Sequence, residues 1–423
     1  MTERFFPPFE EAAFRRRALG EIHARPFMLI PQNRVVLQFA FLREDEGNLE
    51  HAFLGQLCLG RGISPPDAGA SLHQMIWGGG TLRWERHTEF STYYWHGPAP
   101  DAFGGPVHGH PFGSDFTPPG KLISAIRLEV RAGDALLEDA LAQFDRTSLC
   151  RSSTKAGQAE IITDFQQDGD GLTRILVVDR GLTDSALSAL VQRLLELETY
   201  RTLAMLGLPL AQSLSPELRA IENAFADITA KMTAPARGDD ETLLGRISSL
   251  AAELEAGAAQ SLYRFGASRA YHEIVLDRVR NLAEASMMGY ETLGSFLERR
   301  LGPAMRTCKS VEERQGELSR KLSRATILLR TWVDLQLEKQ NGQLLASMDR
   351  RARMQLRLQQ TVEGLSVAAL SYYIIGLIGY LAKAAEHVMV DVDPVMITGV
   401  SVPFVVVAVW MGVRTIRKGH SDH

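Results

Sequence analysis

The chain of 423 residues lacks the short motifs that would place it in several common classes of protein. Its three cysteines, Cys58, Cys150 and Cys308, lie far apart and form no CxxC pair, which predicts reduced, structural thiols. It contains no GxxxxGK[ST] loop, and Gly78–Gly80 is not followed by the further glycines of a dinucleotide-binding turn. The formal net charge is −4, so no overall basic field indicates nucleic acid as a partner.

The first residues, MTERFFPPFEEAAFRRR, contain no apolar core of the kind that a secretory signal peptide needs. We therefore expect the large N-terminal part of the chain to remain in the cytoplasm.

Proline is absent from the 74 residues 309–382. A stretch of that length without proline predicts a long helix, which would extend about 110 Å at 1.5 Å per residue. A heptad-like spacing of apolar residues predicts that this helix packs along a seam against partner helices. The residues of this seam are Leu318, Leu322, Ala325, Leu329 and Trp332. Asn341-Gly342 is a place where the helix would bend or divide.

Two long runs are also free of charge, 18 residues at 365–382 and 19 residues at 395–413. Each is long enough to cross a hydrocarbon core of about 30 Å as a helix. The alternative is a pair of buried helices in a soluble core, but asymmetric flanking charge favours the membrane. Basic residues flank the two runs on their outer sides: Arg350, Arg351, Arg353, Arg357, Arg414, Arg417 and Lys418. The segment between the runs is acidic and contains Glu386, Asp391 and Asp393. Both chain ends are thus predicted in the cytoplasm.

Before these runs, the pattern predicts an α+β protein. Strands are expected at 33–42, within 81–95 and at 122–130, and a hairpin spans the QDGDG turn at 167–171. Helices are expected at 10–22, 49–59, 135–144, 184–206, from Ser215-Pro216-Glu217, and at 243–256, 261–287 and 292–301. This predicts four parts: an α/β domain at 1–182, a helical domain at 183–308, a stalk helix at 309–364 and a transmembrane hairpin at 365–418.

Small residues mark the first predicted span. Gly376 and Gly379 lie one turn apart, which permits either close helix packing or a pore-lining helix that includes Tyr380. In a symmetric oligomer, the outer mouth of that pore would then carry an acidic ring that concentrates cations, formed by Glu386, His387, Asp391 and Asp393.

Three residues near the N-terminus are a candidate ligand corner. Glu21, His23 and Arg25 are suited to hold an anion or relay a proton, but a packed corner between a helix and a strand explains them as well. An enzyme would need a pocket that contains His23 and Arg25 with other titratable groups. No catalytic set is evident, so no enzymatic activity is predicted.

Other polar patterns have structural explanations. His108 and His110 lie in a glycine-rich segment, which favours a surface loop over a metal site. Glu198 and Arg201 are spaced to pair on a helix, and Arg278 belongs to a similar charged face on a later helix. A functional role would require these charged faces to converge.

Four stretches together resemble a family of bacterial proteins of unknown function that are described as membrane-anchored: EIHARPF (21–27), LLELETYRTLAMLGLPLA (194–211), RFGASRAYHEIVLDRV (264–279) and TVEGLSVAALSYY (361–373). The resemblance covers nearly the whole chain. It implies an inner-membrane protein but no activity.

The predicted layout also resembles that of the CorA-type magnesium channels, which are pentamers with a Gly-Met-Asn motif at the outer end of the first span. Gly379 matches the glycine, whereas Tyr380 and Leu381 replace the methionine and asparagine. The resemblance implies a homo-oligomer that passes or senses a divalent cation. The rival hypothesis is a membrane-anchored scaffold without transport activity.

Overall fold

The computed structural model of the chain describes residues 12–15, 19, 28–43, 48–67, 69–133, 137–233, 240–386 and 393–420. It combines an N-terminal β-sheet with a helical remainder, as the sequence predicts. The backbone forms two compact units. The first comprises Met1–Arg237 and Gly245–Thr326, and the second comprises Gly238–Leu244 and Ile327–His423.

In the described residues, nine strands form one sheet in the order β2-β3-β4-β1-β5-β8-β7-β6-β9. Neighbouring strands are antiparallel except β5 and β8, which are parallel. The strands are β1 (Arg34–Leu42), β2 (Leu72–Trp77), β3 (Gly80–Arg86), β4 (Phe90–Pro98), β5 (Lys121–Ala132), β6 (Cys150–Thr154), β7 (Ala159–Gln167), β8 (Thr173–Asp179) and β9 (Ala285–Ser286).

The strands predicted from alternating apolar residues are confirmed as β1, β3, β4 and β5, and β7 and β8 form the predicted hairpin. Strands β2, β6 and β9 were not predicted. Strand β6 buries Cys150, Ser152 and Thr154, which are small side chains that give little apolar signal. The helix expected at 135–144 is shorter, α3 (Leu137–Leu141), and the one expected at 10–22 lies largely outside the described residues.

The three consecutive glycines form the turn between β2 and β3. Gly78 has a φ of 59°, and a Cβ at Gly80 would collide with the carbonyl oxygen of His96 on β4. The left-handed backbone and this close approach both require glycine. The glycines are therefore explained by the hairpin.

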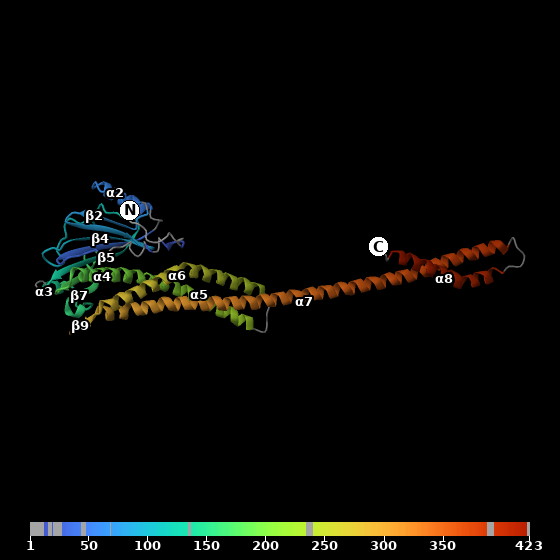
Figure 1. Ribbon diagram of the computed structural model, residues 1–423. Coiled ribbons are helices and arrows are strands. Elements are labelled where there is room, and N and C mark those ends of the chain that lie inside the picture. Colours follow the sequence, from blue (N-terminus) through green and yellow to red (C-terminus); the bar gives the residue numbers. More distant parts are fainter. Residues whose placement is uncertain are drawn as a thin grey trace. The chain divides into compact units, whose positions relative to one another are not determined.

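Helices cover both faces of the sheet (Figure 1). On one face lies α4 (Asp184–Met205), the helix expected at 184–206, which buries an apolar stripe that includes Leu187, Leu190 and Leu194. Its N-terminus is capped by Thr183, whose hydroxyl accepts a hydrogen bond from the Ala186 N–H. Helix α2 (Asn48–Leu59) lies on the other face, where Leu54 packs with aromatic side chains of β3 and β4.

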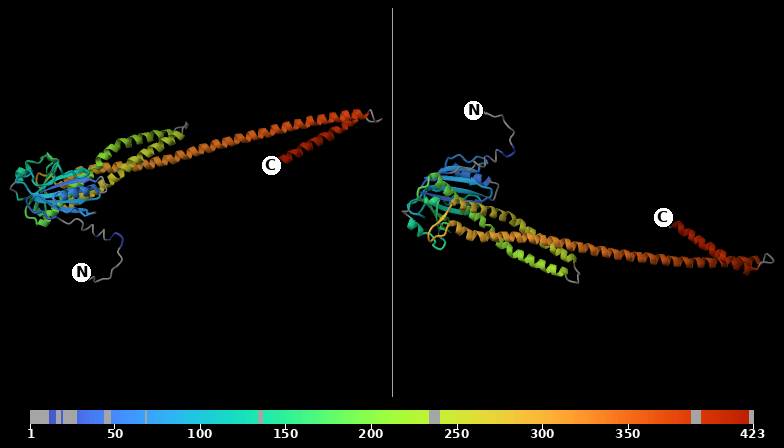
Figure 2. Two further views of the ribbon diagram at one scale, coloured as in Figure 1. Left: turned by 90° about the horizontal axis from the view of Figure 1, so that it is seen from above. Right: turned by 60° about the horizontal axis from the view of Figure 1, so that its bottom comes forward.

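The remaining helices of the first unit run beside one another (Figure 2). They are α5 (Gly207–Thr233), α6 (Asp240–Leu282) and the start of α7 (Leu293–Glu386). Arg314 of α7 lies 2.7 Å from Glu222 of α5, and Ser319 of α7 donates to Glu255 of α6 at 2.7 Å. Leu318, Leu322 and Ala325 of the predicted seam are buried within the chain.

Three predicted helix breaks were wrong. Pro216 lies inside α5, residues 257–260 lie inside α6, and Pro303 lies inside α7. At each place, buried side chains continue on both sides, such as Leu214 and Leu218 around Pro216. Packing against neighbouring helices outweighs the unfavourable local propensity.

The second unit contains the rest of α7 and α8 (Pro394–His420). Among the described residues, these two helices are long and apolar enough to cross a membrane, with mean hydropathies of 1.8 and 2.1 in their apolar windows. Only 11% and 6% of those windows are buried. The helix α7 continues through Asn341-Gly342 without interruption.

Candidate functional site

A cavity of about 220 Å³ lies in the first unit, between helix α4 and the part of the sheet made by β3, β4 and β1. Helix α4 supplies one wall, through Ser188, Gln192, Leu195, Glu196 and Thr199. Arg278 of α6 lines it as well. The cavity therefore brings together residues from strands near position 90 and helices near positions 195 and 278.

The register of the strands produces the polar floor. Tyr94 of β4 pairs with Gln38 of β1 and Arg83 of β3, and Thr92 pairs with Glu85 in the next rung on the same face. Alternation along each strand places these five side chains on one side of the sheet. Residues of the opposite parity, such as Trp84 and Tyr93, pack under α2 instead. The cavity is thus a polar extension of the face that α4 covers.

Opposite charges are paired along both walls. Arg83 forms an ion pair with Glu85, and the His87 ring, 3.9 Å from Glu85, stacks on Phe90 with ring centroids 4.3 Å apart.

On the helical side, Arg278 of α6 donates through Nε to Glu196 of α4 at 2.5 Å and through Nη1 to Asp277 at 2.9 Å. Burial lowers the pKa of Arg278, but the charge of Glu196 and its hydrogen bond, together with the charges of Asp277 and Tyr200, outweigh burial, so the net shift of this pKa is upward. Each arginine of the lining is thus paired with at least one carboxylate.

One polar group of the floor has no hydrogen-bond partner among the described residues. The Tyr94 side chain is 8% exposed, and its hydroxyl oxygen is buried without a partner. Burial raises the pKa of Tyr94 above its ordinary value, which the charge of Arg83 partly offsets. Tyr94 therefore remains a neutral hydroxyl at all ordinary pH values.

The charged faces predicted on the helices converge in part. Glu198 and Arg201 pair as predicted, with Arg201 Nε donating to Glu198 at 2.7 Å. Glu196 and Arg278, from two different stretches, meet at the cavity. The cavity floor was not predicted from the sequence, although charged or polar residues alternate at 83, 85 and 87. Only the strand register brings these residues opposite Tyr94 and α4.

The candidate ligand corner of Glu21, His23 and Arg25 lies outside the described residues, as do His387 and Asp391 of the acidic segment. The side chain of Glu386 is likewise outside them. These predictions therefore stay predictions.

The other candidate residues lie in the hairpin of α7 and α8. Gly379 faces α8, since a Cβ there would stand 3.5 Å from Thr398, whereas a Cβ at Gly376 would meet nothing within 4 Å. Tyr380 is 76% exposed. Asp393 accepts a hydrogen bond from the Val395 N–H at 3.0 Å, so it caps the start of α8. The geometry thus gives Gly379 and Asp393 roles in forming the hairpin.

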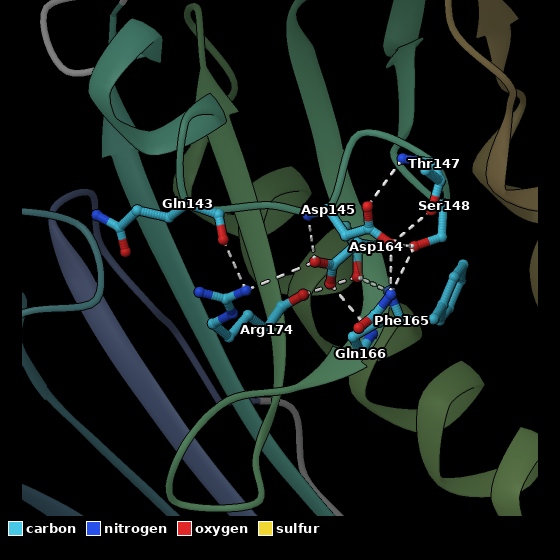
Figure 3. Close-up of polar contacts among 9 residues, drawn as sticks. Gln143, Asp145, Thr147, Ser148, Asp164, Phe165, Gln166 and Arg174 are labelled. Carbon is cyan, nitrogen blue, oxygen red and sulfur yellow. Dashed lines mark hydrogen bonds and ion pairs between the residues drawn. The ribbon is translucent and has the colours of Figure 1, made fainter.

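A second polar cluster lies where β7 and β8 meet the loop after α3 (Figure 3). Asp164 accepts the Asp145 N–H at 2.9 Å and lies 3.5 Å from Arg174, while Gln166 donates to Asp145 at 2.6 Å. Hydrogen bonds from Thr147, together with those from Ser148 and Gln166, lower the pKa of Asp145. The cluster's own groups satisfy these carboxylates, so it fastens the loop to the sheet.

The histidines are held separately. His96 is buried on β4, and His110 accepts the Phe112 N–H through Nδ1 at 3.1 Å. Within the described ranges, no three His, Cys, Asp or Glu side chains form a group suited to hold a metal ion. The three cysteines are unpaired and buried, as predicted.

Comparison with models of protein families matches the chain over most of its length. Residues 10–420 match the model of the family described as "Protein of unknown function (DUF3422)". No curated protein matches the chain.

Proposed function

The chain belongs to the DUF3422 family of proteins of unknown function, and we propose that it is a membrane-anchored protein whose C-terminal helices cross a bilayer as a hairpin. The hairpin consists of the apolar end of α7 and of α8. It anchors the first unit to the membrane.

The observation that carries this proposal is the uncovered apolar surface of the hairpin. Large side chains are exposed along both helices, with Leu377 62%, Leu381 69% and Phe404 72% exposed. Such continuous apolar surface is unfavourable in water but favourable in the hydrocarbon core of a bilayer. Helical backbone satisfies its own hydrogen bonds there, so a helical hairpin suits that environment.

Flanking charge supports an orientation with both ends of the hairpin in the cytoplasm of a bacterial cell. Arg350, Arg351 and Arg353 precede the first apolar stretch and are exposed, and Arg414 follows the second. Lys and Arg are retained on the cytoplasmic side of an inner membrane.

A charge placed in the middle of the hairpin tests the proposal. Leu377→Arg would cost about 3–4 kcal/mol of insertion free energy, so less of the chain should remain in membranes after a urea or carbonate wash. The matched control is Leu345→Arg, because Leu345 is 65% exposed on the same helix but outside the apolar window. A full-length chain that stays monodisperse in buffer without detergent would contradict membrane anchoring.

Cation passage by a homo-oligomer on a CorA-like plan is the second candidate. One observation favours it: Ser371 is 3% exposed in the hairpin, and its hydroxyl has no hydrogen-bond partner among the described residues. Water or a hydrated cation along the hairpin would satisfy that hydroxyl.

Ion flux in proteoliposomes distinguishes the two candidates. Asp391→Asn with Asp393→Asn removes two of the three acidic charges of the segment, while an asparagine at 393 still caps a helix. Cation passage predicts slower flux of a divalent cation and a pentameric particle in detergent. Flux that is absent, or unchanged in the double variant, leaves anchoring as the function of the hairpin.

A further inference from the structure

The cavity beneath α4 is the size of a small metabolite. Its volume of about 220 Å³ lies below the roughly 300–1,000 Å³ that is usual for pockets that bind drug-sized molecules. Its lining mixes charged groups with an apolar set, Met28, Ile30, Phe90 and Leu195. A ligand that fills it must therefore be compact and partly apolar.

The charges of the lining are balanced. Among the residues of the lining, Arg83 and Arg278 supply two positive charges and Glu85 and Glu196 supply two negative ones, while Asp277, which also pairs with Arg278, lies outside the lining. A ligand with a single charge would bind the oppositely charged member of an ion pair and leave the other member without a counter-charge. An uncompensated charge is unfavourable in a partly buried site. A ligand that carries both charges keeps every group paired.

Arg278, on the helical wall of the cavity, offers N–H donors to such a ligand. Arg278 is 31% exposed, and two of the five N–H donors of a guanidinium are engaged in the hydrogen bonds described above. A ligand carboxylate can take a pair of the others, since arginine binds carboxylates through parallel N–H donors.

From this arrangement we propose that the cavity binds a zwitterionic α-amino acid with an apolar side chain. The arginines bind its carboxylate, the glutamates bind its ammonium group, and its side chain lies against Phe90 and Leu195. This site lies wholly within the first unit, and it does not depend on the membrane proposal.

Calorimetry on the full-length chain in detergent micelles tests the ligand class. The probes are L-leucine and L-phenylalanine, with 4-methylpentanoate as the analogue that lacks the ammonium group and 3-methylbutylamine as the one that lacks the carboxylate. We expect at least one amino acid to bind and each leucine analogue to bind at least tenfold more weakly than leucine, or not at all. The absence of binding by both amino acids, or equal binding by an analogue, would overturn the proposal.

Arg278→Gln tests the site. It should weaken binding of the amino acid about tenfold or more, because it removes a charged donor. The matched control is Arg269→Gln, on the same helix, whose partner is Glu312 of α7 and which does not line the cavity. Equal weakening by both variants would place the ligand elsewhere.

A second variant keeps the test independent of the ion pair. Thr92→Val changes a polar floor residue to one of the same shape, so the fold should persist and binding should weaken several-fold. Unchanged binding in both Arg278→Gln and Thr92→Val, with circular dichroism showing folded protein, would refute the assignment.

Discussion

Several buried charges of the first unit depend on a single partner. Glu129 of β5 is fully buried and accepts hydrogen bonds from Arg127 Nε at 2.9 Å, Arg131 Nε at 3.1 Å and the Gly104 N–H at 3.0 Å. Side chains two apart on a strand lie on the same face, so one carboxylate joins both arginines. Removal of this carboxylate would leave two poorly hydrated cations without compensation.

We expect Glu129→Gln to lower the free energy of unfolding by about 3–5 kcal/mol. Denaturant unfolding followed by tryptophan fluorescence would measure the change. In the control Glu312→Gln, the side chains of the lost pair with Arg269 are partly exposed, Arg269 56% and Glu312 30%, so the cost should be at most about 1 kcal/mol. Equal effects of the two substitutions would contradict the buried role of Glu129.

His96 should make stability depend on pH. Burial, together with the charge of Arg34, lowers the pKa of His96 to about 4, so the folded chain keeps the ring neutral. The unfolded chain binds a proton below about pH 6.5. The stability that comes from the neutral ring is therefore complete above pH 6.5 and is lost as the pH falls towards 4.

Unfolding of the wild type and of His96→Gln at pH 7.5 and pH 4.5 would measure this contribution. The wild type should lose up to about 3 kcal/mol more than the variant over that range. Identical pH profiles would show that His96 does not titrate as described.

At the scale of elements, sequence patterns predict much of the fold and little of the site. Periodicity identifies α4, because Leu187, Leu190 and Leu194 bury one face of a regular helix. It fails at Pro216, where tertiary packing continues the helix through a residue that favours a break. The cavity depends on cross-strand neighbours such as Gln38 and Tyr94, which lie 56 positions apart in the chain. Such pairing leaves no local signal.

The two glycines of the first apolar stretch should respond differently to a larger side chain. Gly379→Leu would push against Thr398 of α8 and destabilise the hairpin by about 1–3 kcal/mol. Gly376→Leu is the matched control, because space is open around that position. Thermal unfolding in detergent, followed by circular dichroism, should show a lower Tm for the first variant. If the control is equally destabilised, another surface covers Gly376.

At the scale of the whole molecule, α7 passes through two different environments. Its early residues, such as Leu301, Val311 and Leu318, are buried in the first unit, whereas residues 334–346 are exposed throughout. A helix without tertiary contacts opens easily, because its stability rests on backbone hydrogen bonds alone.

The rate of amide hydrogen exchange should therefore differ between two parts of α7. We expect strong amide protection at 300–325 and weak protection at 335–360 in the purified chain. Strong protection along 335–360 would contradict an uncovered helix and would favour packing against further copies of the chain, as a homo-oligomer requires.

The start of α7 has a consequence for biosynthesis. Leu293, Phe296, Leu297 and Leu301 complete the apolar interior beneath the sheet, where Phe296 stacks on Phe165 with ring centroids 4.9 Å apart. The same helix ends in the first apolar stretch, which the ribosome makes later. The nascent chain thus contains these four apolar side chains before the first apolar stretch has been synthesised. A chain truncated before residue 293 would lack the apolar side chains that complete this interior.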